Sequence, residues 1–124
     1  MLIKHEKYKV NFIDENDNFV GFDDESQCCE EFWWEIINES GDELDEQINK
    51  DFIKLLAFAD QEPLYNLDIV NDKAGDETCY VAFALTLPED TDVCGYLVLY
   101  NYHNGYYAHY WDYKNNLGEY EGSI

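Results

Sequence analysis

The chain has 124 residues, the length of one ordinary domain, and 46% of them are hydrophobic, which is enough for a packed core. Twenty-eight acidic residues stand against seven lysines and no arginine, so the formal net charge is −21. This charge opposes direct binding to nucleic acid or to an anionic membrane, because both need cations against phosphate. No apolar run is long enough to cross a bilayer, and the charged start of the chain does not read as a signal peptide, so we expect a cytoplasmic protein.

Residues 7–25 predict a β-hairpin, because apolar and polar residues alternate on both sides of an acidic turn. Asp14 and Glu25 also stand at the first and twelfth positions of an EF-hand calcium loop. Phe19, however, occupies the position where that loop needs glycine, and no helical pattern flanks it. The sequence therefore favours an acidic hairpin over a calcium site.

The segment "CCEEFWWEII", residues 28–37, fits both a helical stripe and a strand. We favour a strand, because β-branched and aromatic residues dominate it. Cys28 and Cys29 are adjacent and would point to opposite sides of a strand, which makes a poor zinc chelate. Reduced thiols are therefore expected for the four cysteines, although a bridge between Cys79 and Cys94 stays open.

Residues 39–52 are the best helix candidate. Ser40 followed by Glu43 has the spacing of a capping box, and Leu44, Ile48 and Phe52 recur every four residues on one face. The pattern predicts one principal helix, which either continues through residues 53–59 or changes there to a strand.

Residues 65–87 predict a second hairpin with residues 71–76 as its loop. The returning strand, residues 79–87, is largely apolar on both of its faces. We therefore expect this strand to be central in a sheet and covered on both sides.

A third hairpin is predicted around Asn104-Gly105, because this dipeptide is a strong signal for a type I′ turn. The turn would set the register, with Leu99 opposite Tyr110, and would place Tyr100 and Trp111 on one nearly all-aromatic face. That face is either core beneath the helix or a half-exposed binding surface, and both interpretations stay open.

The same register places His103 and His109 on opposite faces of the hairpin, so they could not bind one metal together. Taken together, the patterns predict a single α+β domain over residues 1–124, a mainly antiparallel sheet built from hairpins with one principal helix. We expect no cofactor and no structural metal.

Two motifs together resemble an uncharacterised family of small acidic proteins carried by phages and prophages. They are the Cys-Cys-Glu segment at residues 28–30 and the late Asn-Gly-Tyr-Tyr turn at residues 104–107. The resemblance implies a phage setting and an α+β fold with more strand than helix. It implies no activity and no catalytic residue.

The sequence contains no nucleophile elbow, phosphate loop or dinucleotide fingerprint, so a non-enzymatic role is favoured. The leading hypothesis is an acidic interaction protein that inhibits or sequesters a basic surface of a host protein, such as a nucleic-acid-binding protein, by replacing phosphates with carboxylates. The residues predicted to contact this partner are Asp14, Asp17, Asp23, Asp24, Glu25, Glu30, Glu31, Asp42, Glu43, Asp45, Glu46, His103, Tyr106 and Tyr107.

Two alternatives stay open. A toxin-immunity protein would use the same electrostatics. A small-molecule or cation-binding module would use the aromatic hairpin face as a pocket wall, with His103 or His109 as the polar contact.

Overall fold

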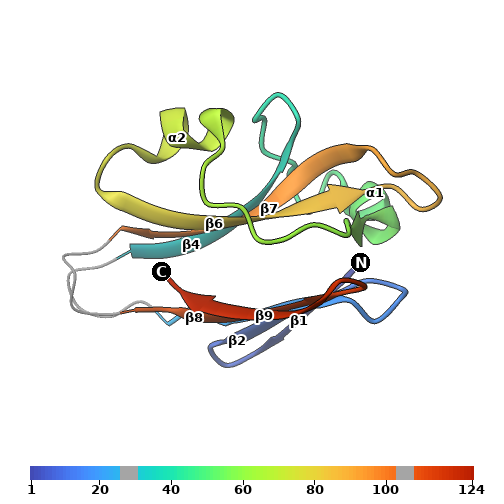
Figure 1. Cartoon of the computed structure of the whole chain (residues 1–124), viewed down its shortest axis with the longest axis horizontal. Coiled ribbons are helices and arrows are strands. Elements are labelled where there is room, and N and C mark those ends of the chain that lie inside the picture. Colours follow the sequence, from blue (N-terminus) through green and yellow to red (C-terminus); the bar gives the residue numbers. More distant parts are fainter. Residues whose placement is uncertain (26–30, 103–107) are drawn as a thin grey trace.

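The computed structural model describes residues 1–25, 31–102 and 108–124, and residues 26–30 and 103–107 lie outside the described part. Two antiparallel sheets pack face to face (Figure 1). Sheet A contains, in spatial order, β1 (Leu2–Glu6), β2 (Lys9–Ile13), β3 (Phe19–Asp23), β8 (Tyr110–Asn115) and β9 (Gly118–Ser123). Sheet B contains, in spatial order, β4 (Glu31–Asn38), β7 (Val93–Tyr102), β6 (Thr78–Thr86) and β5 (Ala57–Phe58).

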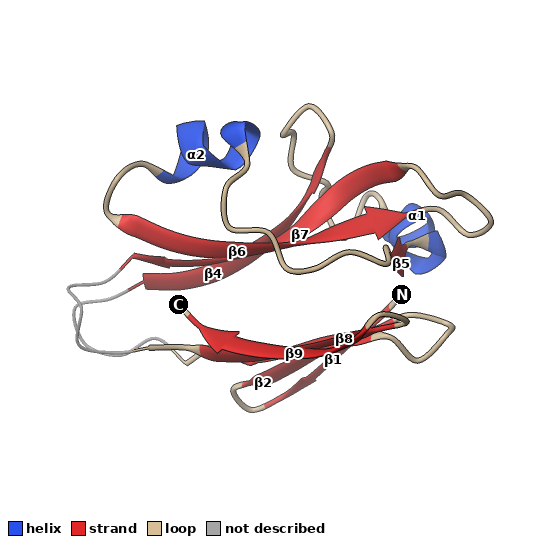
Figure 2. Cartoon of the chain, in the orientation of Figure 1, coloured by secondary structure: helices blue, strands red, loops and turns tan. Residues whose placement is uncertain are grey.

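Strand far outweighs helix in the described residues (Figure 2). The helices there are short: α1 (Lys50–Leu55) lies at one end of the sandwich, and α2 (Asp68–Ala74) lies over the outer face of sheet B. The broad expectation of an antiparallel, sheet-dominated α+β fold is therefore confirmed, and the helical part differs from the prediction.

The main core lies between the two sheets and follows the alternation of the strands. Val10 and Phe12 of β2 are fully buried, whereas the residues between and beside them are at least partly exposed. Phe83 of β6 meets Trp111 and Tyr113 of β8, with ring centroids 5.3 and 4.8 Å apart. These edge-to-face contacts join sheet B to sheet A, and each fully buried side chain of this size contributes about 2–3 kcal/mol.

A second, smaller core lies on the other side of sheet B, beneath α2. It contains Ile37, Val70, Tyr80, Val98 and Tyr100, all with less than a tenth of their surface exposed. β6 is therefore covered on both faces, as the sequence predicts for residues 79–87. The predicted hairpin of residues 7–25 and the predicted strand at residues 31–37 are also confirmed, as β2–β3 and β4.

The predicted helix beginning at Ser40 does not form; helical structure starts only at Lys50. The side-chain oxygen of Asn38 accepts two backbone N–H groups of the following loop, at 2.9 and 3.0 Å. The carboxylate of Asp45 accepts two more, at 2.9 and 3.1 Å. These local hydrogen bonds compete with the helical pattern and hold residues 38–42 and 45–48 in turns, and Glu43 between them forms an isolated bridge with Ile37.

The hairpin predicted over residues 65–87 is also wrong, because residues 68–74 form α2 rather than a strand. The apolar spacing of Leu67, Val70 and Ala74 serves a helix that packs on sheet B. Leu64, just before α2, makes only an isolated bridge with Ala82 of β6.

The hairpin predicted over residues 96–113 is not formed either, because β7 and β8 belong to different sheets. Leu99 was predicted to lie opposite Tyr110, but it pairs with Trp34 of β4 and with Val81 of β6. The turn at residues 104–105 itself lies outside the described residues. The local turn signal therefore did not determine which strand β7 takes as its neighbour.

Candidate functional site

Charge is distributed unequally over the two sheets. The segment that builds sheet B and both helices, residues 31–102, contains 17 acidic residues and three lysines, a net charge of −14. The two segments that build sheet A, residues 1–25 and 108–124, contain ten acidic residues and four lysines, a net charge of −6. Glu30 supplies the remaining unit of the total of −21. Most of the negative charge therefore belongs to the segment that builds sheet B, which carries 14 net charges over 72 residues, against six over 42 residues in the sheet A segments.

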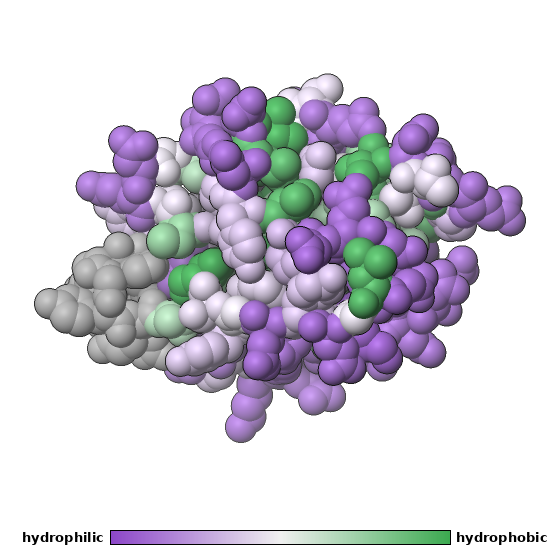
Figure 3. Space-filling view, viewed as in Figure 1, coloured by the Kyte–Doolittle hydropathy of each residue, from purple (hydrophilic) through white to green (hydrophobic). Residues whose placement is uncertain are grey.

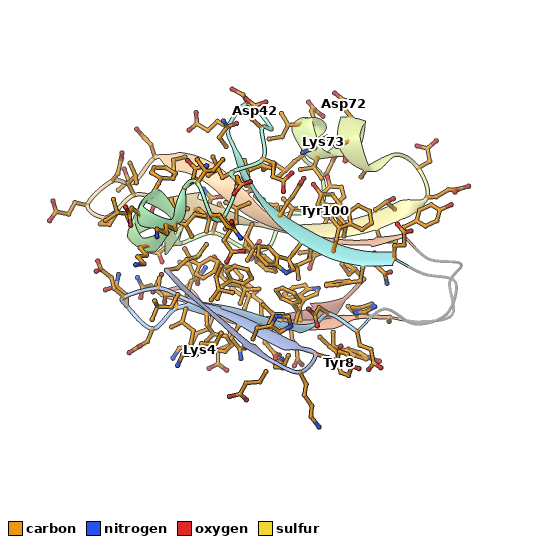
Figure 4. The ribbon with its side chains drawn as sticks, turned by 180° about the vertical axis from the view of Figure 1, so that it is seen from behind. Lys4, Tyr8, Asp42, Asp72, Lys73 and Tyr100 are labelled. Carbon is orange, nitrogen blue, oxygen red and sulfur yellow. The ribbon has the colours of Figure 1, made fainter. Side chains whose placement is uncertain are left out.

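Lysines lie on the outer face of sheet A, among acidic residues. Val10 and Phe12 point into the core, so Lys9 points outward, and the register places Lys4 on the same outer face. Lys114 lies on this face too, two residues from Asp112 on β8. Figure 4 shows Lys4 and Tyr8 on this side, away from the core. This face has mixed charge, and neither of the described helices covers it.

The opposite side of the sandwich carries the acidic face, which we define by Glu31, Glu35, Asp42, Asp68, Asp72 and Glu77. Glu31 and Glu35 project from the outer face of β4, and the others belong to the loop after β4, to α2 and to the turn after it. Figure 4 shows Asp42, Asp72 and Lys73 grouped at this surface, with Tyr100 beneath them.

Lys73 connects the elements that carry the acidic face. Its ammonium nitrogen lies 2.9 Å from a carboxylate oxygen of Glu35 and 3.2 Å from the carbonyl oxygen of Gly41. It therefore links α2 both to β4 and to the loop that follows β4.

Tyr100 extends this network into the small core. Its hydroxyl donates to the Glu35 carboxylate at 2.5 Å, a charge-assisted hydrogen bond. Burial raises the pKa of the Tyr100 phenol well above its usual range, and the hydrogen bond and negative charge of Glu35 raise it further. Tyr100 therefore stays a neutral donor at physiological pH, and Glu35 remains available as its acceptor.

On the part of the outer face of sheet B that α2 does not cover, aromatic side chains are partly exposed. Trp33 is 38% exposed and stacks on Tyr100, with ring centroids 4.9 Å apart. Tyr102 is 45% exposed and donates to the Glu77 carboxylate at 2.9 Å. Rigid, half-exposed aromatic rings beside carboxylates are typical of protein-binding surfaces.

The sequence prediction did not single out Trp33, Tyr102 or the acids of α2 as site residues. The alternation of β4 and β7 could have paired Trp33 with Tyr100 once these strands were known to be neighbours. The acids of α2 were missed because residues 71–76 were interpreted as a hairpin loop.

The predicted contact residues do not form one patch. Asp42 and Glu31 lie on the acidic face, whereas Asp17 lies in the β2–β3 turn and Asp23 lies at the other end of β3. Asp24 pairs with His5, with 3.0 Å between Nε2 and the carboxylate. Exposed positions on the loop between β4 and α1 are occupied by Glu43, Asp45 and Glu46, and Glu25 is half-buried after β3. Glu30, His103, Tyr106 and Tyr107 lie outside the described residues.

Asp14 is buried and has a structural role instead of an exposed one. Its carboxylate accepts the backbone N–H groups of Asn16, Asn18 and Phe58, at 2.9 to 3.0 Å. These contacts fix the β2–β3 turn against β5, so Asp14 does not belong to a partner-binding surface.

The aromatic wall proposed for a small-molecule pocket is not assembled. Tyr100 faces α2, whereas Trp111 and Tyr113 face the core between the sheets. His109 is buried, stacks on Phe32 with centroids 4.2 Å apart, and places Nδ1 2.8 Å from the carbonyl oxygen of Asp23. His109 therefore packs between the two sheets.

Within the described part of the chain, no group of three or more His, Cys, Asp or Glu side chains is arranged to hold a metal ion. Cys79 and Cys94 are both free thiols. None of the described helices is long and apolar enough to span a membrane.

Comparison with known proteins gives no match: no family model, no curated protein and no solved structure is significantly similar to the chain. The geometry and charge of the surface itself are therefore the basis for a functional proposal.

Proposed function

We propose that the protein is a non-enzymatic acidic interaction protein that binds a basic surface of another protein through its acidic face. The observation that carries this proposal is the excess of 17 acidic residues over three lysines in residues 31–102, combined with the exposed rings of Trp33 and Tyr102. Carboxylates would attract and orient a basic partner, and the rings would supply apolar contact area at low entropic cost.

The phage resemblance suggests a more specific form of this proposal. In that form, the partner is a nucleic-acid-binding protein of the host, and the acidic face occupies the surface that normally contacts phosphate. Duplex DNA should then compete with the protein for its partner, and the competition should weaken as salt rises.

Affinity capture with matched charge variants tests the proposal. One variant neutralises four charges of the acidic face: Asp42→Asn, Asp68→Asn, Asp72→Asn and Glu77→Gln. Its control neutralises four charges on the sheet A side: Glu6→Gln, Glu15→Gln, Asp112→Asn and Glu119→Gln. Both variants change the net charge equally, so only the position of the charge differs.

In a bacterial lysate at low salt, we expect the wild type and the control to capture the same basic protein, and the acidic-face variant to lose it. The captured protein is identified by mass spectrometry and then tested in purified form. Equal capture by both variants would show that the acidic face is not the binding surface.

A further inference from the structure

A groove lies on one side of the sandwich, between the free edge of β9 and the segment that is attached to β6 through Leu64. It has a volume of about 260 Å³ and is lined by Glu62, Pro63, Tyr65, Trp111, Tyr120 and Glu121, which together define the edge groove. β9 supplies one wall, and the segment between β5 and α2 supplies the other. Figure 3 views this side: side chains of intermediate hydropathy lie across its middle, with hydrophilic side chains above and below.

The walls are held firmly in place. Leu64 and Ala82 exchange two backbone hydrogen bonds of 2.8 Å, which attaches the segment that carries Tyr65 to β6. Tyr65 approaches Trp111 with ring centroids 6.4 Å apart, and Tyr120 stacks on Tyr113 at 5.8 Å. The groove is therefore built between anchored elements, with the buried Trp111 at its base and the exposed Tyr65 at its rim.

The chemistry of the lining suits a cation. Aromatic faces attract ammonium and guanidinium groups, and Arg and Lys side chains commonly lie over tyrosine or tryptophan. The carboxylate residue Glu62 lies on the same wall as Tyr65, and none of the described lining residues is a lysine. Glu121 pairs with Asp112, so its side chain points to the outer face of sheet A and only its backbone borders the groove.

The indole nitrogen of Trp111 offers a second, independent sign of a ligand. Trp111 is only 2% exposed, and its Nε1 is buried without a hydrogen-bond partner among the described residues. A buried donor of this kind is costly unless it is paired, and a peptide carbonyl would be a suitable acceptor.

The backbone of β9 also presents hydrogen-bonding groups at this edge. His109 and Ile124 exchange both backbone hydrogen bonds, at 2.8 and 3.0 Å. In an antiparallel pair such bonded pairs alternate, so Trp111 and Gly122 form the next one along the register. The N–H and C=O groups of Glu121 therefore point away from β8, towards the open edge.

We propose that the edge groove binds a lysine or arginine side chain carried by an extended segment of the partner, which pairs with the edge of β9. The rings of Tyr65 and Tyr120 and the carboxylate of Glu62 hold the cation, and the outward-facing backbone groups of β9 hold the segment. This inference rests on the proposed function for the basic character of the partner. It concerns different residues from the acidic face.

The test uses the purified chain and synthetic peptides, so its failure is distinguishable from failure of the lysate capture. The probes are blocked Gly-Gly-Lys-Gly-Gly, its arginine counterpart and its norleucine counterpart, at about 150 mM salt to screen diffuse attraction. Indole N–H signals of the three tryptophans are followed by nuclear magnetic resonance, with Trp33 as an internal control on the other side of sheet B.

We expect both cationic peptides to shift the Trp111 signal saturably, at least about tenfold more tightly than the norleucine peptide. Tyr65→Ala should weaken binding at least about fivefold, whereas Tyr8→Ala, at an equally exposed tyrosine outside the groove, should not change it.

A pair of single variants separates local binding from the general charge of the chain. Glu62→Gln should weaken binding, whereas Glu6→Gln, an equal change in charge elsewhere, should leave it unchanged. Equal weakening in both variants, a Trp33 shift as large as that of Trp111, or equal binding of the norleucine peptide would each overturn the proposal.

Discussion

The two cores of this protein use the same residue types for different purposes. Between the sheets, Phe83, Trp111 and Tyr113 are almost completely buried and join one sheet to the other. Beneath α2, Tyr100 is equally buried, but its hydroxyl donates to the half-buried Glu35 carboxylate, which also contacts the exposed Lys73, and its ring stacks on the exposed Trp33. Two equally buried tyrosines therefore have different roles: one only packs the core, and the other also connects the core to groups at the surface. Burial alone does not distinguish these two roles.

The largest expected effect is in the core between the sheets. Phe83→Ala should lower the free energy of unfolding by about 4 kcal/mol, because a large cavity opens between β6 and β8. Val70→Ala beneath α2 should cost about 2 kcal/mol, since less apolar volume is removed under a short helix. Denaturant unfolding of both variants measures the two losses in unfolding free energy. Equal losses would show that the two cores contribute equally to stability.

Alkaline pH provides the next comparison. Burial raises the pKa of Tyr113 to about 12, whereas an unfolded tyrosine ionises near pH 10. The unfolded state therefore loses its proton first, so the stabilisation is complete below about pH 10 and is lost as pH rises towards 12. The loss should amount to about 2 kcal/mol, and the raised pKa of Tyr100 acts in the same direction.

Tyr113→Phe should reduce this alkaline loss, measured as the difference in unfolding free energy between pH 8 and pH 11. Tyr110→Phe, at a tyrosine that is 73% exposed, is the matched control and should leave the difference unchanged. An identical alkaline slope in wild type and Tyr113→Phe would contradict the assignment.

A smaller effect is expected at the hydrogen bond that joins the minor core to the acidic face. Tyr100→Phe should cost about 1 kcal/mol, because Glu35 keeps its contact with Lys73 when the hydroxyl is removed. Lys73→Met should cost a comparable amount, since the lysine is partly exposed but the carboxylate it leaves is only 10% exposed and keeps the Tyr100 hydroxyl as its partner. A double-mutant cycle measures their coupling through Glu35, and strictly additive losses would argue against a shared network.

The smallest change in stability is expected at the exposed rings. Tyr102→Phe should leave the unfolding free energy nearly unchanged, because its hydrogen bond to Glu77 lies at the surface. Trp33→Ala and Tyr102→Ala should instead reduce partner capture. A large loss of stability without a loss of capture would show that these rings contribute to the packing of sheet B and not to partner binding.

The sequence predicted the individual strands better than their partners. Alternation in β2 and β3 follows from a local period of two, and the apolar faces of β6 indicate a strand covered on both sides; these strands lie where the patterns place them. The pairing of β7 with β4 and β6 depends on which apolar faces meet in three dimensions, and a turn signal at residues 104–105 carries no such information.

The helices were harder to predict for a different reason. The carboxylate of Asp45 and the amide of Asn38 accept backbone N–H groups in turns, and a capping-box spacing cannot exclude that outcome. Ile48, expected on the buried face of the helix, is 80% exposed. The sequence likewise shows the acidic residues of the candidate surface. It does not show that they group around Lys73, because this grouping depends on where α2 packs.

The chain path through the two sheets bears on how the protein folds. Sheet B is built from one continuous segment, residues 31–102, whereas sheet A joins strands from the two ends of the chain through the pairing of β3 with β8. Pairing Phe22 with Trp111 requires closure of a very long loop, whose entropic cost falls once the intervening residues are already compact. We therefore expect sheet B to form first and to act as the template on which the terminal strands assemble, so that hydrogen exchange protects the amides of β6 and β7 before those of β3 and β8 during refolding.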